Sequence, residues 1–157
     1  MKQSYKNKLI IFFLIGIVTF LYSSCDTTDR NHFKLYSIDK KQCVTIITKM
    51  DTRYIINGNH DSVPISDYVK IDISEIDPIG DEIGVCWNNG NYDWEIVNHQ
   101  SKVIVNKLDT LKYKFNINWE LDERRIPNCL KYHQSNCGTI GLSHMKIYKN
   151  KGIILEY

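Results

Sequence analysis

The chain has 157 residues and a formal net charge of +2, and the excess positive charge lies at its N-terminal end. Residues 1–25 contain three lysines and no acid, so the remainder carries a net charge of −1. A near-neutral remainder excludes the dense basic surface of a nucleic-acid-binding domain, and we expect no nucleic-acid partner. Its length suits one domain and is too short for two.

The first 25 residues have the three parts of a secretory signal peptide. Three lysines open the segment, an apolar run follows from Leu9 to Tyr22, and Ser23 and Ser24 are the small residues at the boundary. A helix that spans a bilayer needs about 20 apolar residues, so the run is short for a permanent span. The segment therefore predicts export.

The end of this segment, Leu21-Tyr22-Ser23-Ser24-Cys25, resembles the lipobox of bacterial lipoproteins. It departs from the usual pattern at Tyr22, where leucine is common. The resemblance covers residues 1–25 only. It implies that Cys25 is lipidated and becomes the first residue of a protein of the cell envelope, extracytoplasmic and held in an inner or outer membrane. Acyl chains such as palmitate, at about 0.8 kcal/mol per buried methylene, make such an anchor effectively permanent.

Residues 26–32 are polar and predict a short tether, and residues 33–157 predict a single β-rich domain. Short segments of alternating polarity, rich in β-branched residues, predict strands, and the chain contains no alanine, the best helix former. These segments span residues 33–38, 42–49, 53–57, 68–74, 83–87, 92–97, 102–106, 111–119, 144–148 and 153–157. The fold class we expect is all-β, a small antiparallel β-sandwich or barrel, and the pattern does not separate the two.

The clearest hairpin joins residues 83–87 to residues 92–97. Asn89-Gly90 is a preferred pair for a type I′ turn, which predicts that Trp87 pairs with Tyr92 and that Val85 pairs with Trp94. In that register Ile83 lies opposite Ile96, and all six side chains share one face. The other face carries Cys86, Asp93 and Glu95, and we expect Asp93 and Glu95 to face water.

Four cysteines remain after Cys25, an even number in an oxidising compartment. Cys129 and Cys137 are close in sequence and are expected to pair, which leaves Cys43 and Cys86 to join two strands. Three connectivities are open, and the alternative is that Cys43 and Cys86 are small buried hydrophobic residues.

Two sets of residues are considered as possible metal-binding sites. Cys129, His133, Cys137 and His144 are ligand types that zinc prefers, but their spacing matches no zinc-finger pattern. Gly58-Asn59-His60-Asp61 resembles the GNHD segment of the metallophosphoesterases, whose other metal-binding motifs are absent from this chain. A polar turn explains the segment without catalysis. We therefore assign no metal, no cofactor and no catalytic residue.

Five aromatic residues could form either a core or a ligand platform: Trp87, Tyr92, Trp94, Tyr113 and Trp119. Their alternation with polar residues favours the core. A smaller role in ligand binding stays open for Trp87, Tyr92 and Trp94.

The function that these patterns favour is a small envelope module that binds a partner protein or a small ligand. A small hydrolase is the alternative, and a cleft joining Asp93, Glu95 and a histidine would support it. A purely structural envelope lipoprotein is the third hypothesis, which a large flat self-complementary patch would support.

Overall fold

A computed structural model describes residues 31–98, 100–117, 135–148 and 152–157. The predicted signal peptide, Cys25, most of the tether, Trp119, Cys129 and His133 lie outside these ranges. Within them, no helix is long and apolar enough to span a bilayer.

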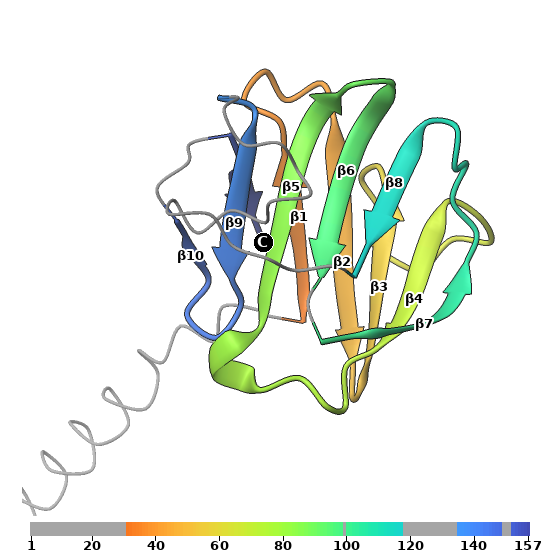
Figure 1. Cartoon of the computed structure of the whole chain (residues 1–157), viewed down its shortest axis with the longest axis vertical. Helices are drawn as coiled ribbons and strands as arrows, with labels where there is room; N and C mark the ends of the chain where they lie inside the picture. Colours follow the sequence, from red (N-terminus) through yellow and green to blue (C-terminus); the bar gives the residue numbers. More distant parts are fainter. Residues whose placement is uncertain (1–30, 99, 118–134, 149–151) are drawn as a thin grey trace, which may run out of the picture.

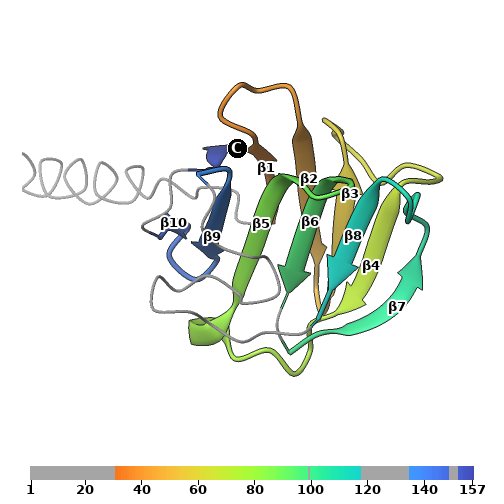
Figure 2. The same ribbon diagram turned by 45° about the horizontal axis from the view of Figure 1, so that its top comes forward.

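Two sheets face each other (Figures 1 and 2). Of the two architectures expected from the sequence, the fold is therefore the β-sandwich and not the barrel. The first sheet has the order β11-β1-β2-β3-β4-β7, with bounds Ile154–Glu156, His32–Tyr36, Cys43–Lys49, Thr52–Asn57, Tyr68–Asp72 and Lys102–Asn106. The second has the order β10-β9-β5-β6-β8, with bounds Lys146–Ile147, Cys137–Gly141, Glu82–Asn89, Tyr92–Asn98 and Tyr113–Asn116. A 3-10 turn at Pro78–Gly80 precedes β5.

The pairing is antiparallel except between β6 and β8, which run parallel. The fold is therefore all-β as predicted, but one strand pair departs from the expected antiparallel arrangement. The expected strands at residues 111–119 and 144–148 shorten to β8 and β10. Leu111 is 84% exposed, contrary to its place on the predicted buried face, because it lies in a turn whose backbone bonds to Asp109.

The core lies between the sheets and takes its side chains from both. Alternate residues of a strand point to opposite faces, so each sheet gives one apolar row to the interior. The largest fully buried members are Trp87, Trp94, Phe33, Leu35, Ile46, Ile55, Ile71, Ile83 and Ile96.

The β5–β6 hairpin pairs in a different register from the predicted one. Asn89 lies opposite Tyr92, and Trp87 lies opposite Trp94. Gly90 has a φ of 65°, and no positive φ occurs at the next residue, as in a type II′ turn. The turn therefore lies one residue later, at Gly90-Asn91, and each β5 residue pairs with a β6 residue two positions farther from the turn than predicted. Because the shift is an even number, the predicted aromatic face is still the buried one.

The opposite face of the hairpin is only partly exposed, so one expectation was wrong. Asp93 is exposed, but Glu95 is 2% exposed. Its Oε2 accepts a 2.7 Å hydrogen bond from Asn89 Nδ2, and its Oε1 lies 2.9 Å from Lys114 Nζ. A buried carboxylate is tolerated because it has these two partners.

The disulfide joins Cys86 to Cys137, which lie opposite each other on β5 and β9. The expected pairs Cys129–Cys137 and Cys43–Cys86 are therefore wrong. Cys43 is half-buried and is the unbonded cysteine of the described ranges. The bridge closes a separation of 51 residues and ties β9 to the centre of the second sheet.

Arg53 of β3 points between the sheets and is 3% exposed. Its guanidinium donates to both carboxylate oxygens of Asp81, at 2.9 and 2.6 Å, and to Asn98 Oδ1 at 2.9 Å. A guanidinium removed from water is stable only with such partners. These bonds join the first sheet to the entry of β5 and the end of β6.

We expect Asp81→Ala to lower the free energy of unfolding by about 2–4 kcal/mol, because it leaves a buried arginine without its counter-ion. Asp61→Ala is the matched control, since the Asp61 side chain is 93% exposed and its pair with Lys34 should contribute less than about 1 kcal/mol. Urea unfolding of the purified proteins measures both. Equal stability of the two variants would show that the Arg53 cluster contributes little.

Candidate functional site

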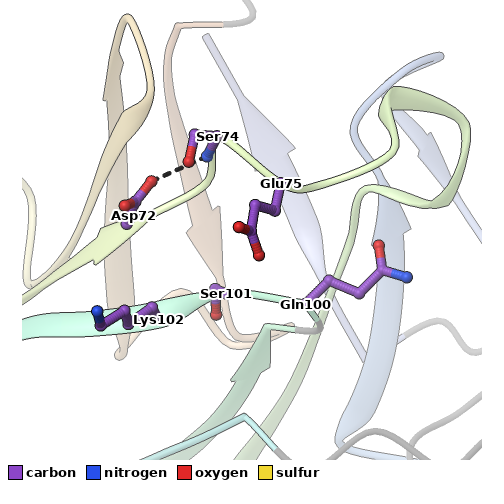
Figure 3. Close-up of a pocket in the computed structure, with 6 residues that line it drawn as sticks. All are labelled: Asp72, Ser74, Glu75, Gln100, Ser101 and Lys102. Carbon is purple, nitrogen blue, oxygen red and sulfur yellow. Dashed lines mark hydrogen bonds between the residues drawn. The ribbon is translucent and has the colours of Figure 1, made fainter.

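The sandwich has a hollow at each end. One hollow, of about 500 Å³, is lined by Asp72, Ser74, Glu75, Gln100, Ser101 and Lys102. Figure 3 shows the Glu75 carboxylate between Ser74 and Ser101. Hydrogen bonds from the Ser74 backbone and side chain lower the pKa of Asp72. None of the six lining residues that the structure describes is aromatic or aliphatic, so these side chains offer a ligand no ring surface.

The second hollow, at the opposite end, is a groove of about 530 Å³. Its lining combines aromatic rings, side-chain amides, two lysines and an aspartate. The residues are Tyr36, Lys40, Lys41, Gln42, Cys43, Asn57, Gly58, Asn59, Asp93, Trp94 and Tyr113. Small-molecule sites share this combination of a ring surface with a few polar groups.

The groove passes over the end of β2, because its residues come from both faces of the first sheet. Leu35 and Val44 point into the core, so their neighbours Tyr36 and Cys43 point to the outer face. On the core side, Trp94 and Tyr113 stack with ring centroids 5.0 Å apart and planes inclined by 23°. The groove therefore has aromatic rings on both sides of the strand.

Two side chains, one from the β1–β2 turn and one from β3, bond the two sides of the groove to each other. Gln42 Nε2 donates to Asn88 Oδ1 at 3.0 Å and to the carbonyl oxygen of Asp93 at 2.8 Å, so the β1–β2 turn is bonded to the β5–β6 hairpin. Asn57 Oδ1 accepts a 3.0 Å hydrogen bond from Trp94 Nε1. Both bonds connect the two sheets, which fixes the width of the groove at this end.

Several polar groups of the groove have no protein partner in the described part of the chain. They are the Asn57 amide nitrogen and the Asn59 side chain. Gln42 Oε1 also lacks a partner, but it is buried, so a ligand does not reach it in this conformation. The Asn57 nitrogen and the Asn59 side chain can bond a ligand without breaking a bond within the protein.

The two lysines of the groove are already paired with acids. Lys40 lies 2.5 Å from Glu156 Oε1, and Lys41 lies 3.6 Å from Asp39 Oδ2. Both pairs are solvent-exposed, so they restrain the two lysines only weakly.

Cys43 faces Tyr36 across the β1–β2 pair. Burial raises the pKa of the Cys43 thiol, and a hydrogen bond with Tyr36 offsets part of this rise. Burial and the neighbouring thiol also raise the pKa of Tyr36. The thiol is therefore held in its protonated and less nucleophilic form.

The Gly58–Asp61 segment is a turn that folds back over the outer face of the first sheet. Gly58 has a φ of 91°, which other residues rarely adopt. Thr45 Oγ1 donates to the Gly58 carbonyl at 2.7 Å and accepts from the His60 amide at 3.1 Å. The His60 ring nitrogen Nε2 contacts the Asn57 carbonyl at 2.9 Å. Local hydrogen bonding thus accounts for the Gly-Asn-His-Asp sequence.

The described ranges contain no group of three histidine, cysteine or acidic side chains placed to hold a metal ion. Of the cysteine and histidine set that the sequence singles out, Cys137 is in the disulfide and His144 is exposed. The other two members lie outside the described residues.

The aromatic residues divide between core and rim. Trp87 and Trp94 are each 1% exposed and belong to the core, as the alternation predicts. Tyr92 is half-buried, with Lys114 Nζ 5.6 Å from its ring centroid, and does not line the groove. Of the three residues considered for ligand binding, only Trp94 reaches the groove.

Most groove residues carry no signal in the sequence. Gln42, Asn57 and Asn59 are ordinary turn or strand-end residues, and they meet only because the ends of β2, β3 and β6 lie at the same end of the sandwich. No family model, curated protein or solved structure matches the chain.

We expect Cys43 to react slowly with N-ethylmaleimide at pH 7 in the folded protein and rapidly in urea. The raised pKa lowers the thiolate fraction, so the folded-state rate should continue to increase above the ordinary thiol pKa of about 8.5. Peptide mapping by mass spectrometry identifies the modified position. Equal rates at Cys43 in the folded and unfolded protein would contradict the placement of this thiol.

Proposed function

We propose that this protein is a lipid-anchored, extracytoplasmic binding module that holds a ligand in the groove over the end of β2. The observation that supports the proposal is the lining of that groove, in which aromatic rings lie beside polar groups that have no partner among the described residues. The sequence of residues 1–25 supports the anchor.

The construction of the groove supports binding by a preformed site. Gln42 and Asn57 already bond the two sheets to each other, so the walls need little ordering when a ligand arrives. Ordering of loops and side chains is a main cost of association, and a preformed groove avoids much of it.

A hydrolase finds less support in this geometry. Glu95 is buried against Asn89 and Lys114, and no histidine is among the groove residues that the structure describes. Within the described ranges, a convergence of Asp93, Glu95 and a histidine, which would favour catalysis, is not seen. We therefore keep binding as the proposed function.

The anchor is tested by Cys25→Ser with radioactive palmitate. The parent protein should incorporate the label and fractionate with membranes, whereas the variant should lose both properties because the acylated atom is the Cys25 sulfur. Cys43→Ser is the matched control and should keep the label. Full labelling of Cys25→Ser would rule out lipidation at this residue.

Binding in the groove is tested by protection of Cys43, because this thiol lines it. We expect an envelope extract, separated into saccharide, peptide and lipid fractions, to contain a fraction that slows alkylation of Cys43 several-fold. Tyr113→Ala should abolish the protection, since it removes a half-buried ring of the groove.

Met50→Ala provides the control for the protection assay. Met50 is 94% exposed in the turn between β2 and β3, at the other end of the sandwich, so its truncation should leave protection unchanged. If Cys43 is alkylated at the same rate with and without every fraction, the groove does not bind a ligand from this extract, which would contradict the proposal.

A further inference from the structure

Two exposed apolar side chains lie at the end of the sandwich opposite the groove. Met50, in the turn between β2 and β3, is 94% exposed, and Ile79, in the 3-10 turn before β5, is 81% exposed. Figure 1 shows both turns at the end of the sandwich where β1 begins. The Asp51 carbonyl accepts a 2.9 Å hydrogen bond from the residue after β4, and Asp81, next to the 3-10 turn, bonds Arg53. The two apolar groups therefore belong to turns of fixed position.

The fold itself does not require an apolar residue at either position. Met50 has a φ of 50°, a backbone conformation that favours glycine or asparagine. Ile79 takes part in the 3-10 turn through its backbone, whose amide donates to Asp77 Oδ1 at 3.0 Å. Both side chains lie outside the hydrophobic core, and polar residues are the usual choice in such turns. Turn geometry and core packing thus leave both side chains unexplained.

Single exposed apolar side chains are common on protein surfaces, so their location decides what they mean. The opposite end of the sandwich also carries exposed aliphatic residues, which are Ile38, Ile65 and Leu111. The entry of the chain distinguishes the two ends. Thr48 N donates to the Asn31 carbonyl at 2.7 Å, so the chain enters the sandwich beside the end of β2, two residues before Met50.

The chain between the proposed anchor and the sandwich is short. Residues 26–31 are six residues, which reach at most about 20 Å when fully extended. If Cys25 carries lipid, as proposed above, this segment holds the Met50 end of the sandwich close to the bilayer. We infer that Met50 and Ile79 insert into the surface of the bilayer that holds the Cys25 lipid, and that this contact fixes the orientation of the domain.

The anchor makes such a small contact effective. Two side chains bury too little apolar area to hold a free protein on a membrane. Attached lipid makes their insertion an intramolecular step with a high effective concentration. The contact then orients the domain, while the lipid provides the attachment.

The charges of this end decide which lipids it accepts. The exposed charged residues on and beside the two turns are Lys49, Asp51, Glu75 and Asp77, three acids and one lysine. Anionic headgroups repel such a surface, so the contact is made with zwitterionic lipid such as phosphatidylethanolamine. It should weaken when phosphatidylglycerol is added at low salt and recover when salt screens the repulsion.

The experiment uses the full-length lipidated protein in vesicles of phosphatidylethanolamine and phosphatidylcholine. Brominated phosphatidylcholine quenches tryptophan on contact, so Met50→Trp reports insertion of the first turn. After subtraction of the parent, which has three tryptophans, the added emission should shift to shorter wavelength and be largely quenched. Leu111→Trp is the matched control, because Leu111 is 84% exposed at the other end of the sandwich, and its emission should not be quenched.

A charge in the second turn tests whether both turns make the contact. Ile79→Glu, added to Met50→Trp, should reduce the quenching, because a carboxylate resists transfer from water into the bilayer surface. Ile65→Glu is the control and should leave the quenching unchanged, since Ile65 is 89% exposed at the groove end. Both substitutions are at exposed positions, so both variants should fold normally.

Equal quenching in Met50→Trp and Leu111→Trp, or stronger quenching in Leu111→Trp, would overturn the inference. An unquenched Met50→Trp variant that still floats with the vesicles would also overturn it, but would leave the anchor and the groove proposals intact. If the parent does not float with the vesicles, the anchor fails and this inference fails with it. Binding in the groove is tested separately, by alkylation of Cys43.

Discussion

The inward face of β3 connects the two sheets at both ends of the sandwich. Alternation along the strand places Arg53, Ile55 and Asn57 on one face, so a charged group, an apolar group and an amide all point into the interior. Arg53 bonds Asp81 and Asn98, Ile55 packs in the core, and Asn57 bonds Trp94. Burying a guanidinium is costly, and the bidentate carboxylate pair makes it tolerable while fixing one geometry.

This constraint also determines the groove. Arg53 joins the two sheets at one end of the sandwich. At the other end, the hydrogen bonds of Gln42 and Asn57 fix the distance between the sheets, and with it the width of the groove. Each of these amides uses some of its hydrogen-bonding capacity between the sheets, and the Asn57 nitrogen stays available to a ligand. If the groove binds a ligand as proposed, the same side chain would serve both stability and recognition, because its bond to Trp94 already fixes its position.

Alternation in the sequence predicted most of the strands and the buried aromatic face, because a period of two follows directly from strand geometry. It missed β9, whose five residues are all buried and do not alternate in polarity. It failed for Glu95, which was expected to face water although it is buried with Asn89 and Lys114 as partners. Nor does the sequence pattern indicate that Arg53 is buried against Asp81 and Asn98. The cysteine pairing failed for a related reason. Cys86 and Cys137 become neighbours only through the long-range pairing of β5 with β9, which sequence proximity does not reveal.

The course of β1 relates the groove to the proposed anchor. The described chain enters the sandwich next to His32, and β1 ends at Tyr36, which lines the groove. Four steps of about 3.3 Å place the groove about 13 Å further along the strand than the point of entry. With lipid on Cys25, the short polar segment before β1 would hold the entry end near the membrane. The groove would then lie at the end of the domain that faces away from the bilayer, where an extracytoplasmic ligand has access.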